Sequence, residues 1–133
     1  MDYVLDTNIC IYIAKQKPMA VYERFSQLDV GSVGMSYVTY GELRYGALKS
    51  RQSEIALARL DELISLIPVL PAHPQIAHHY ASIRADLAER GLPIGNNDLW
   101  IAAHVRAERK ILVSNNLREF GRVHGLASEN WVG

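Results

Sequence analysis

The chain has 133 residues, of which 49% are hydrophobic and 21% are charged, and its fourteen basic and fourteen acidic residues cancel. This length and composition predict a single globular domain over residues 1–133 and exclude a disordered or low-complexity chain. The zero net charge argues against a protein that coats nucleic acid through a general excess of positive charge. It is compatible with a nuclease whose acids are gathered in one pocket, because the remaining surface is then net basic.

The sequence also predicts where the protein works. The N-terminus lacks a basic stretch followed by a long apolar one, and no run of about 18 apolar residues could span a bilayer. The single cysteine, Cys10, excludes an internal disulfide framework and is typical of a small buried residue in a reducing compartment. We therefore expect a cytoplasmic protein without a membrane partner.

Short apolar runs alternate with helical patterns along the chain. We expect strands at residues 3–5, 33–36, 69–70, 111–114 and 127–131. We expect helices over residues 9–13, 18–28, 39–50, 53–67, 73–91, 98–109 and 115–120. Strands that alternate with helices imply βαβ units, so the predicted fold class is α/β, a three-layer α/β/α sandwich with a mostly parallel central sheet.

Particular residues are predicted to begin or end these helices. Asn8 and Asn97 are expected to cap the helices that follow them, and Thr39 with Glu42 has the spacing of a capping box. Pro18 is placed to begin a helix, because its missing N–H is harmless in a first turn.

Four acids fall near the expected ends of strands or the starts of helices. Asp6 ends the first strand, Glu42 follows the second, Asp98 opens a helix and Glu119 lies one turn after the fourth strand. Ligands of open parallel sheets collect at the carboxyl ends of the strands, so these side chains are expected to converge there. Each also has a purely structural explanation, as a helix cap, a charge at a helix N-terminus or a solvated surface group.

Convergence of these acids would require a cation or bound protons. Two carboxylates about 4 Å apart repel by roughly 4 kcal/mol at an effective dielectric near 20. Oxygen ligands without histidine or cysteine suit Mg²⁺ or Mn²⁺, which bind through a few carboxylates and a substrate phosphate. The pattern therefore favours metal-assisted hydrolysis of a phosphodiester.

Other chemistries find little support in the sequence. The five histidines, at positions 73, 78, 79, 104 and 124, show no zinc-type spacing, so surface or core roles are predicted for them. The sequence contains no glycine-rich phosphate loop, and Ser114 does not stand in a nucleophile elbow.

Four segments together resemble a known family. They are LDTNICIYI at 5–13, TYGELRYGALKS at 39–50, IGNNDLWIAAH at 94–104 and LVSNNLREFGRVHGLASENW at 112–131. In this order and spacing they resemble the PIN-domain ribonucleases of the VapC toxin type, from bacterial VapBC toxin–antitoxin pairs. The resemblance covers essentially the whole chain and implies a PIN-domain fold with an Mg²⁺- or Mn²⁺-dependent endoribonuclease site.

The resemblance also implies residue roles. Asp6, Glu42 and Asp98 match the three acids of the family, with Asp6 and Asp98 as the most direct metal ligands. Many members carry a fourth acid in a T-N-D motif, where this chain has Asn116. Glu119 can supply that charge, or Asn116 can hydrogen-bond a metal-bound water.

Further residues are implied to support the site or to contact RNA. Thr7, Asn8, Ser114 and Asn116 would orient the acidic groups. The candidate RNA contacts, for which a solvated surface charge is the alternative, are Lys15, Lys17, Arg118 and Arg122.

The implied reaction is in-line attack by a metal-activated water on an RNA phosphodiester, which leaves 5′-phosphate and 3′-hydroxyl ends. Relatives with this C-terminal motif cleave tRNA, including initiator tRNA in the anticodon region, so tRNA is the expected substrate and inhibition of translation the expected outcome. The implied partners are a second copy of the chain and a VapB-type antitoxin, whose arginine would neutralise the acidic site.

Two rival readings stay open. The first is a catalytically inactive PIN-like module that binds RNA or serves as a scaffold, which the amide at Asn116 favours. The second is a phosphotransfer receiver domain, which would need paired acids near the N-terminus and a lysine that closes the pocket. Only Asp6 and the more distant Asp2 are available for that pair.

Overall fold

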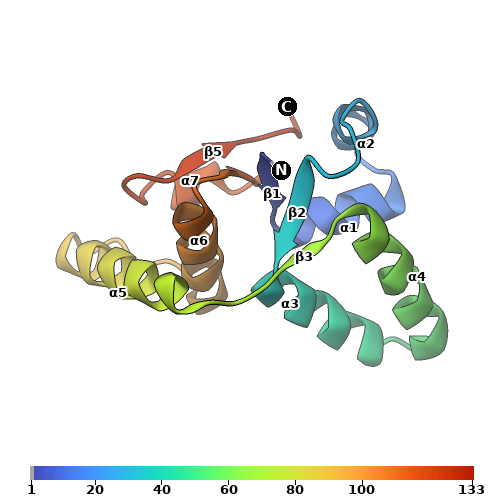
Figure 1. The fold of residues 1–133 in the computed structure, drawn as a ribbon, viewed down its shortest axis with the longest axis horizontal. Helices are drawn as coiled ribbons and strands as arrows, with labels where there is room; N and C mark the ends of the chain where they lie inside the picture. The colour runs from blue at the N-terminus through green and yellow to red at the C-terminus, as the bar shows by residue number, and fades with distance from the viewer. Residues whose placement is uncertain (1) are drawn as a thin grey trace.

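A parallel sheet runs through the middle of the molecule (Figure 1). Within residues 2–133, the part of the chain that the computed structural model describes, five strands lie in the order β3-β2-β1-β4-β5. The strands are β1 (Tyr3–Leu5), β2 (Val33–Ser36), β3 (Val69–Leu70), β4 (Ile111–Val113) and β5 (Ala127–Glu129). Every neighbouring pair is parallel, which confirms the predicted mostly parallel sheet.

Helices cover both faces of this sheet. They are α1 (Thr7–Lys15), α2 (Met19–Ser26), α3 (Tyr37–Leu48), α4 (Ser53–Leu66), α5 (Pro74–Glu89), α6 (Asn96–Glu108) and α7 (Leu117–Phe120). In Figure 1, α5, α6 and α7 lie to the left of the sheet, and α1, α2 and α4 lie to its right. The predicted α/β/α sandwich is therefore confirmed. None of the helices described between residues 2 and 133 is long and apolar enough to cross a bilayer.

Two apolar clusters form the core, one on each face of the sheet. Successive side chains of a strand point to opposite faces, and β1 shows this directly. Val4 packs with residues of α5 and α6, whereas Leu5 packs with residues of α1, α2 and α4. Cys10 belongs to the second cluster and is fully buried, as predicted, and burial raises the pKa of its thiol. A thiol held in the protonated form is a poor nucleophile.

The strand order creates a reversal point between β1 and β4. The chain proceeds from β1 outward through β2 to β3, and then crosses back to β4 and β5 on the other side of β1. The two central strands remain joined at their carboxyl ends, where the Asp6 N–H donates to the Val113 carbonyl at 3.0 Å. Open α/β sheets bind ligands at such a reversal point, outside the carboxyl ends of the strands.

Three helices, α1, α3 and α6, begin earlier than the sequence predicted. Asn8 does not cap α1, because Asp6 leaves β1 in an extended conformation and its carboxylate takes that position. Asn97 does not cap α6, because Gly95 occupies the capping position and the helix starts at Asn96. Asp98 is therefore the third residue of α6 and lies in its first turn.

The predicted capping box of Thr39 and Glu42 is also wrong. Strand β2 passes directly into α3 without a loop, so Ser36 serves as the cap and its Oγ accepts from the Val38 N–H at 3.1 Å. In Figure 1, α3 starts at the lower end of β2, on the edge of the sheet where the carboxyl ends of the strands lie. Thr39 and Glu42 lie inside the helix, which leaves both side chains available for contacts with other segments.

Candidate active site

Asp6 stands at the reversal point of the sheet and is 6% exposed. Its Oδ1 accepts from the Ile9 N–H at 3.0 Å, so one carboxylate oxygen caps α1. Burial raises the pKa of Asp6, and the nearby Glu42 carboxylate adds to that rise, whereas hydrogen bonds from Ser114 and Ile9 oppose it. Asp6 thus caps α1 and is also a buried carboxylate at the carboxyl edge of the sheet.

Glu42 reaches the same edge from α3 and is held by a threonine of α1. Thr7 Oγ1 donates to Glu42 Oε1 at 2.7 Å and lies 3.3 Å from Thr39 Oγ1. Thr7 and Thr39 therefore link the first turn of α1 to α3, and they orient the Glu42 carboxylate toward Asp6. This contact explains why a threonine directly follows Asp6 in the sequence.

The pKa of Asp98 shows how strongly burial and the neighbouring acids act at this site. Its pKa is raised from 3.8 to about 6, first by partial burial and then by the negative charges of Glu119, Asp6 and Glu42. A hydrogen bond with Glu119 adds to this rise. Asp98 is therefore close enough to Glu119, Asp6 and Glu42 for their charges to act on it, although Asp6 and Glu119 are 113 residues apart in the sequence.

Glu119 and Asn116 act together at the start of α7. Asn116 Nδ2 donates to Glu119 Oε2 at 2.9 Å, and the Asn116 N–H donates to Ser114 Oγ, also at 2.9 Å. Ser114 is fully buried and hydrogen-bonds Asp6 in turn. The amide that replaces the expected fourth acid thus positions a carboxylate three residues later, and that carboxylate faces Asp98.

The charges of this site have no cationic partner among the residues that the structure describes. Salt bridges within residues 2–133 involve other groups and none of the four acids. The donor set consists of carboxylate, hydroxyl and amide oxygens, which Mg²⁺ and Mn²⁺ prefer. A hard divalent cation therefore fits the residues present, and it would relieve the repulsion that raises the pKa of Asp98.

The remaining predicted residues differ in how exposed their side chains are. Asn8 is exposed in the first turn of α1, and Lys15, Lys17 and Arg118 are exposed as well. Arg122 is half-buried, and its Nη1 donates to the Pro93 carbonyl at 3.2 Å.

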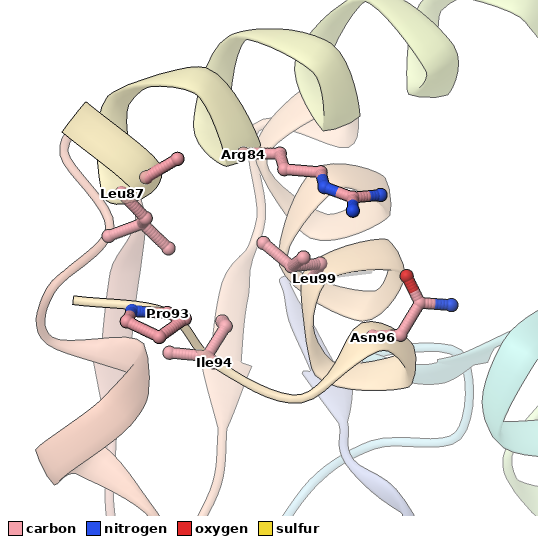
Figure 2. Close-up of a pocket in the computed structure, with 7 residues that line it drawn as sticks. Arg84, Leu87, Pro93, Ile94, Asn96 and Leu99 are labelled. Atoms are coloured by element: carbon pink, nitrogen blue, oxygen red, sulfur yellow. The ribbon is translucent and has the colours of Figure 1, made fainter. Parts of the chain in front are cut away.

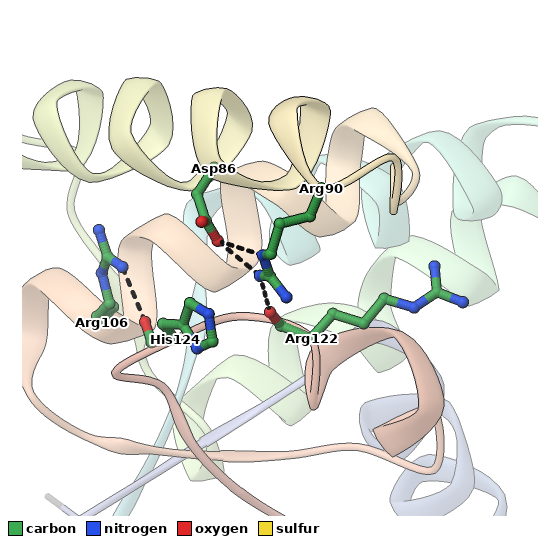
Figure 3. Close-up of polar contacts among 5 residues, drawn as sticks. All are labelled: Asp86, Arg90, Arg106, Arg122 and His124. Carbon is green, nitrogen blue, oxygen red and sulfur yellow. Dashed lines mark hydrogen bonds and ion pairs between the residues drawn. The ribbon is translucent and has the colours of Figure 1, made fainter.

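Contacts behind Arg122 fix the loop that carries it. Arg90 Nη2 donates to Asp86 Oδ2 at 2.6 Å and also to the Arg122 carbonyl. Arg106 Nη1 donates to the His124 carbonyl at 2.9 Å, which ties the same loop to α6. Figure 3 shows that the Arg122 side chain extends away from the Asp86–Arg90 pair. The loop is therefore held at the Arg122 and His124 carbonyls and by the hydrogen bond from the Arg122 guanidinium to Pro93.

An apolar hollow of about 260 Å³ lies beside the first turn of α6 (Figure 2). Its lining consists of Arg84, Leu87, Ala88, Pro93, Ile94, Asn96 and Leu99. Because this lining contains no carboxylate, the hollow is distinct from the acidic centre, although Asn96 and Leu99 flank Asp98 in the sequence.

The structure also brings together three residues that the sequence did not connect. His73 Nε2 lies 2.6 Å from Glu108 Oε1, and His104 Nε2 lies 3.8 Å from the same oxygen. The spacing of His104 and Glu108, four residues apart on one helix, was the available signal. His73 could not be added to them from the sequence, because it lies 31 residues before His104 and before α5 begins.

Comparisons with known proteins agree with this geometry. Residues 3–126 match the sequence profile of the PIN domain. The chain is 46% identical over 132 residues to ribonuclease VapC2 of Haemophilus influenzae, with 99% of each chain covered. It is 47% identical over 131 residues to the tRNA(fMet)-specific endonuclease VapC of Shigella flexneri, with 98% of each chain covered.

Solved structures show the same relationship in three dimensions. The chain resembles VapBC-1 from nontypeable Haemophilus influenzae with a TM-score of 0.91 and 40% identity, over 100% of both chains. It resembles VapBC2 from Rickettsia felis, solved on a DNA fragment from the promoter, with a TM-score of 0.90 and 37% identity over 98% of this chain and 99% of that one. As its four sequence motifs predict, the chain belongs to the PIN-domain family and, within it, to the VapC type.

Proposed function

We propose that this chain is a divalent-metal-dependent endoribonuclease that acts as the toxin of a VapBC-type pair. The observation that carries the proposal is the grouping of Asp98 with Glu119, Asp6 and Glu42 near the reversal point of the sheet, where burial and these three charges together raise the pKa of Asp98 to about 6. Such a group of like charges favours a bound cation strongly, and a substrate phosphate can complete the coordination of that cation.

Asp6 and Asp98 are the proposed ligands of Mg²⁺ or Mn²⁺, and Glu42 and Glu119 complete the acidic group. When bound, the cation would neutralise charge on the phosphate and lower the pKa of the attacking water. The other residues position these acids: Thr7 holds Glu42 through the 2.7 Å hydrogen bond, and Asn116 holds Glu119 at 2.9 Å. Ser114 contributes by hydrogen-bonding Asp6.

The raised pKa of Asp98 implies a pH dependence of metal binding. Below about pH 6 this carboxyl holds a proton in the metal-free protein, so a cation must displace that proton in order to bind. We therefore expect the metal concentration needed for half-maximal cleavage to rise as the pH falls through 6.

The proposed substrate is tRNA, with initiator tRNA as the first candidate. Two similar proteins, from Shigella flexneri and Salmonella typhimurium, are tRNA(fMet)-specific endonucleases at 47% and 42% identity. Cleavage of initiator tRNA would stop translation, and it requires the protein to act in the cytoplasm. A VapB-type antitoxin is the proposed inhibitor, because similar solved structures are VapBC pairs, and a second copy of the chain is the proposed partner in a homodimer.

Cleavage of purified total tRNA by the purified, antitoxin-free chain tests this proposal. The reaction is followed with Mg²⁺ or Mn²⁺ and with EDTA, for the parent and for Asp6→Asn. The asparagine retains an oxygen that can cap α1, so the variant removes the charge and keeps the helix start. We expect discrete fragments with 5′-phosphate ends that EDTA abolishes and that Asp6→Asn reduces about 100-fold or more, because metal ligation contributes several kcal/mol.

The matched control is Asp61→Asn, which removes an exposed carboxylate of α4 and should leave cleavage unchanged. Equal cleavage by the parent and Asp6→Asn, or cleavage that persists in EDTA, would contradict the proposed mechanism. Binding of tRNA without any cleavage, with or without metal, would favour the inactive RNA-binding module instead.

A further inference from the structure

His73, His104 and Glu108 form a cluster at the far end of α6 from the four acids. Within residues 2–133, this is the one set of three histidine, cysteine or acidic side chains whose ligand atoms all lie within 4.8 Å of one another. His104 and Glu108 belong to the last turns of α6, and His73 directly precedes α5. Asp98 and His104 are separated by six residues, or about 9 Å of helix, so the cluster is distinct from the acidic centre.

The buried histidine of this cluster has an unused nitrogen. His104 is fully buried, and its Nε2 has no hydrogen-bond partner within the residues that the structure describes. Buried ring nitrogens normally have a partner, so an unpaired one that points toward a carboxylate and a second histidine indicates a missing ligand. The groups beside this ring include the Glu108 carboxylate at 3.8 Å from Nε2, the Tyr37 ring at 5.4 Å between centroids and the His73 ring at 6.1 Å.

The other nitrogen of His104 is fixed in the way that metal-binding histidines require. Nδ1 lies 2.8 Å from Ser36 Oγ, and that oxygen is held in place because it also caps α3. When Nδ1–H donates to Ser36, the lone pair of Nε2 is free to bind a metal.

The distances between the donors are close to those of a tetrahedral site. Ligands at about 2.0–2.1 Å from zinc stand about 3.3 Å apart in a tetrahedron. The His73–Glu108 distance of 2.6 Å must open by less than 1 Å, and the His104–Glu108 distance of 3.8 Å must close by about half that amount. The side chains of His73 and Glu108 are 34% and 26% exposed, so a cation can enter from solvent on their side.

We propose that His73, His104 and Glu108 bind a zinc ion that links the start of α5 to the end of α6, with water as the fourth ligand of the zinc. Two imidazoles and a carboxylate form a set that zinc binds readily and that Mg²⁺ disfavours. The bound ion joins segments 35 residues apart, from His73 to Glu108, beside the residue that caps α3. Zinc therefore stabilises the folded chain without taking part at the acidic centre.

Nitrogen-15 NMR of the histidine side chains tests the site on the intact chain, because it resolves the rings one by one. On addition of one equivalent of Zn²⁺ to the metal-free protein, we expect the Nε2 resonances of His73 and His104 to move. The other three histidines, including exposed His78, should not move. Zinc that reaches the acidic centre leaves these ring nitrogens unaffected, so the readout distinguishes the two places.

Zinc affinity of variants provides the second readout, by equilibrium dialysis. His73→Gln and Glu108→Gln change partly exposed residues and leave buried His104 in place. Each should weaken zinc binding about tenfold or more, since the loss of even an outer-shell partner has that effect on metal sites. His78→Gln is the matched control, because it removes an exposed histidine of α5.

Two results would overturn the proposal. One is an NMR titration in which the Nε2 resonances of His73 and His104 stay in place at saturating Zn²⁺. The other is equal zinc affinity for the parent, His73→Gln, Glu108→Gln and His78→Gln. Either result would mean that His73 and Glu108 contact each other at 2.6 Å and bind no metal.

Discussion

Two clusters of titratable groups lie at opposite ends of helix α6, and they differ in how their polar groups are paired. At its start, Asp98 is partly buried near three other carboxylates, and burial together with their negative charges raises its pKa to about 6. Near its end, buried His104 is held by Ser36 at 2.8 Å, and Glu108 pairs with His73 at 2.6 Å. The first cluster contains only carboxylates, which repel one another. The second contains two histidines and a carboxylate, which partly pair with one another.

This difference indicates what each cluster contributes to the protein. A group of repelling carboxylates destabilises the metal-free fold and is retained where it binds something. A buried histidine with a fixed hydrogen bond belongs to the core and stabilises the fold even before any metal binds. Removal of one group from each end of α6 should therefore change the stability of the metal-free protein in opposite directions.

The largest effect is expected at the histidine end. His104→Ala removes a fully buried ring and leaves the Ser36 hydroxyl without this contact. We expect the free energy of unfolding to fall by about 2–4 kcal/mol, from the cavity and the lost hydrogen bond together. Urea unfolding in EDTA measures this value. His78→Ala, at an exposed position of α5, should stay within about 0.5 kcal/mol of the parent, and an equally small change for His104→Ala would contradict the expectation.

The opposite sign is expected at the acidic end. Folding raises the pKa of Asp98 from 3.8 to about 6, so between these values the folded chain binds more protons than the unfolded chain. Stability therefore falls as the pH rises through this window, and the full loss is present above about pH 6. Asp98→Asn removes it and should raise the free energy of unfolding at pH 7 by about 1–3 kcal/mol in EDTA.

The pH series supplies the test of this second prediction. The gain of Asp98→Asn should shrink below pH 6 and vanish below about pH 3.8, where the parent carboxyl is protonated in both states. Asp61→Asn, on exposed α4, should show no such gain at any pH. A destabilised Asp98→Asn at pH 7 would mean that attraction to a protein group, and not repulsion, dominates at this position. Saturating Mg²⁺ should reduce the difference, because it stabilises only the parent site.

The arrangement of strands and acids was predictable because both depend on local patterns. The strand at residues 33–36 has the predicted bounds, and the end of β1 and the start of α6 bring Asp6 and Asp98 near each other. The helix starts were less predictable. Asn8 and Asn97 have side chains that often cap helices. Asp6, which directly follows β1, takes the capping position of α1, and Gly95 takes that of α6.

The histidine cluster could not be predicted, for a geometric reason. Its contacts depend on how α5 and α6 pack, and that packing is set by many apolar side chains distributed over both helices. The same reason applies to Asn116. From the sequence it was either a lost acid or a ligand for water, and only the three-dimensional arrangement shows its amide donating to Glu119.

A smaller effect should separate the role of Asn116 from that of its neighbour. Asn116→Ala removes the 2.9 Å hydrogen bond that holds Glu119 against Asp98. We expect about a tenfold slower cleavage of tRNA at saturating Mg²⁺, in line with the loss of one hydrogen bond to a charged group. Asn115→Ala is the matched control, because that exposed amide bonds only the Tyr12 hydroxyl at 2.9 Å. Equal rates for the two variants would mean that Glu119 needs no support.

The smallest effect is expected outside both clusters, at the exposed guanidinium of Arg118. Arg118 lies next to Glu119 and is exposed, so it can contact an RNA phosphate while the acids hold the metal. Arg118→Ala, combined with Asp6→Asn to prevent cleavage, should weaken tRNA binding several-fold and reduce the salt dependence by about one phosphate contact. Filter binding across a range of salt concentrations measures both quantities. Arg59→Ala on α4 serves as the control, and an identical salt slope for the two variants would place Arg118 outside the RNA interface, because each lost phosphate contact lowers that slope.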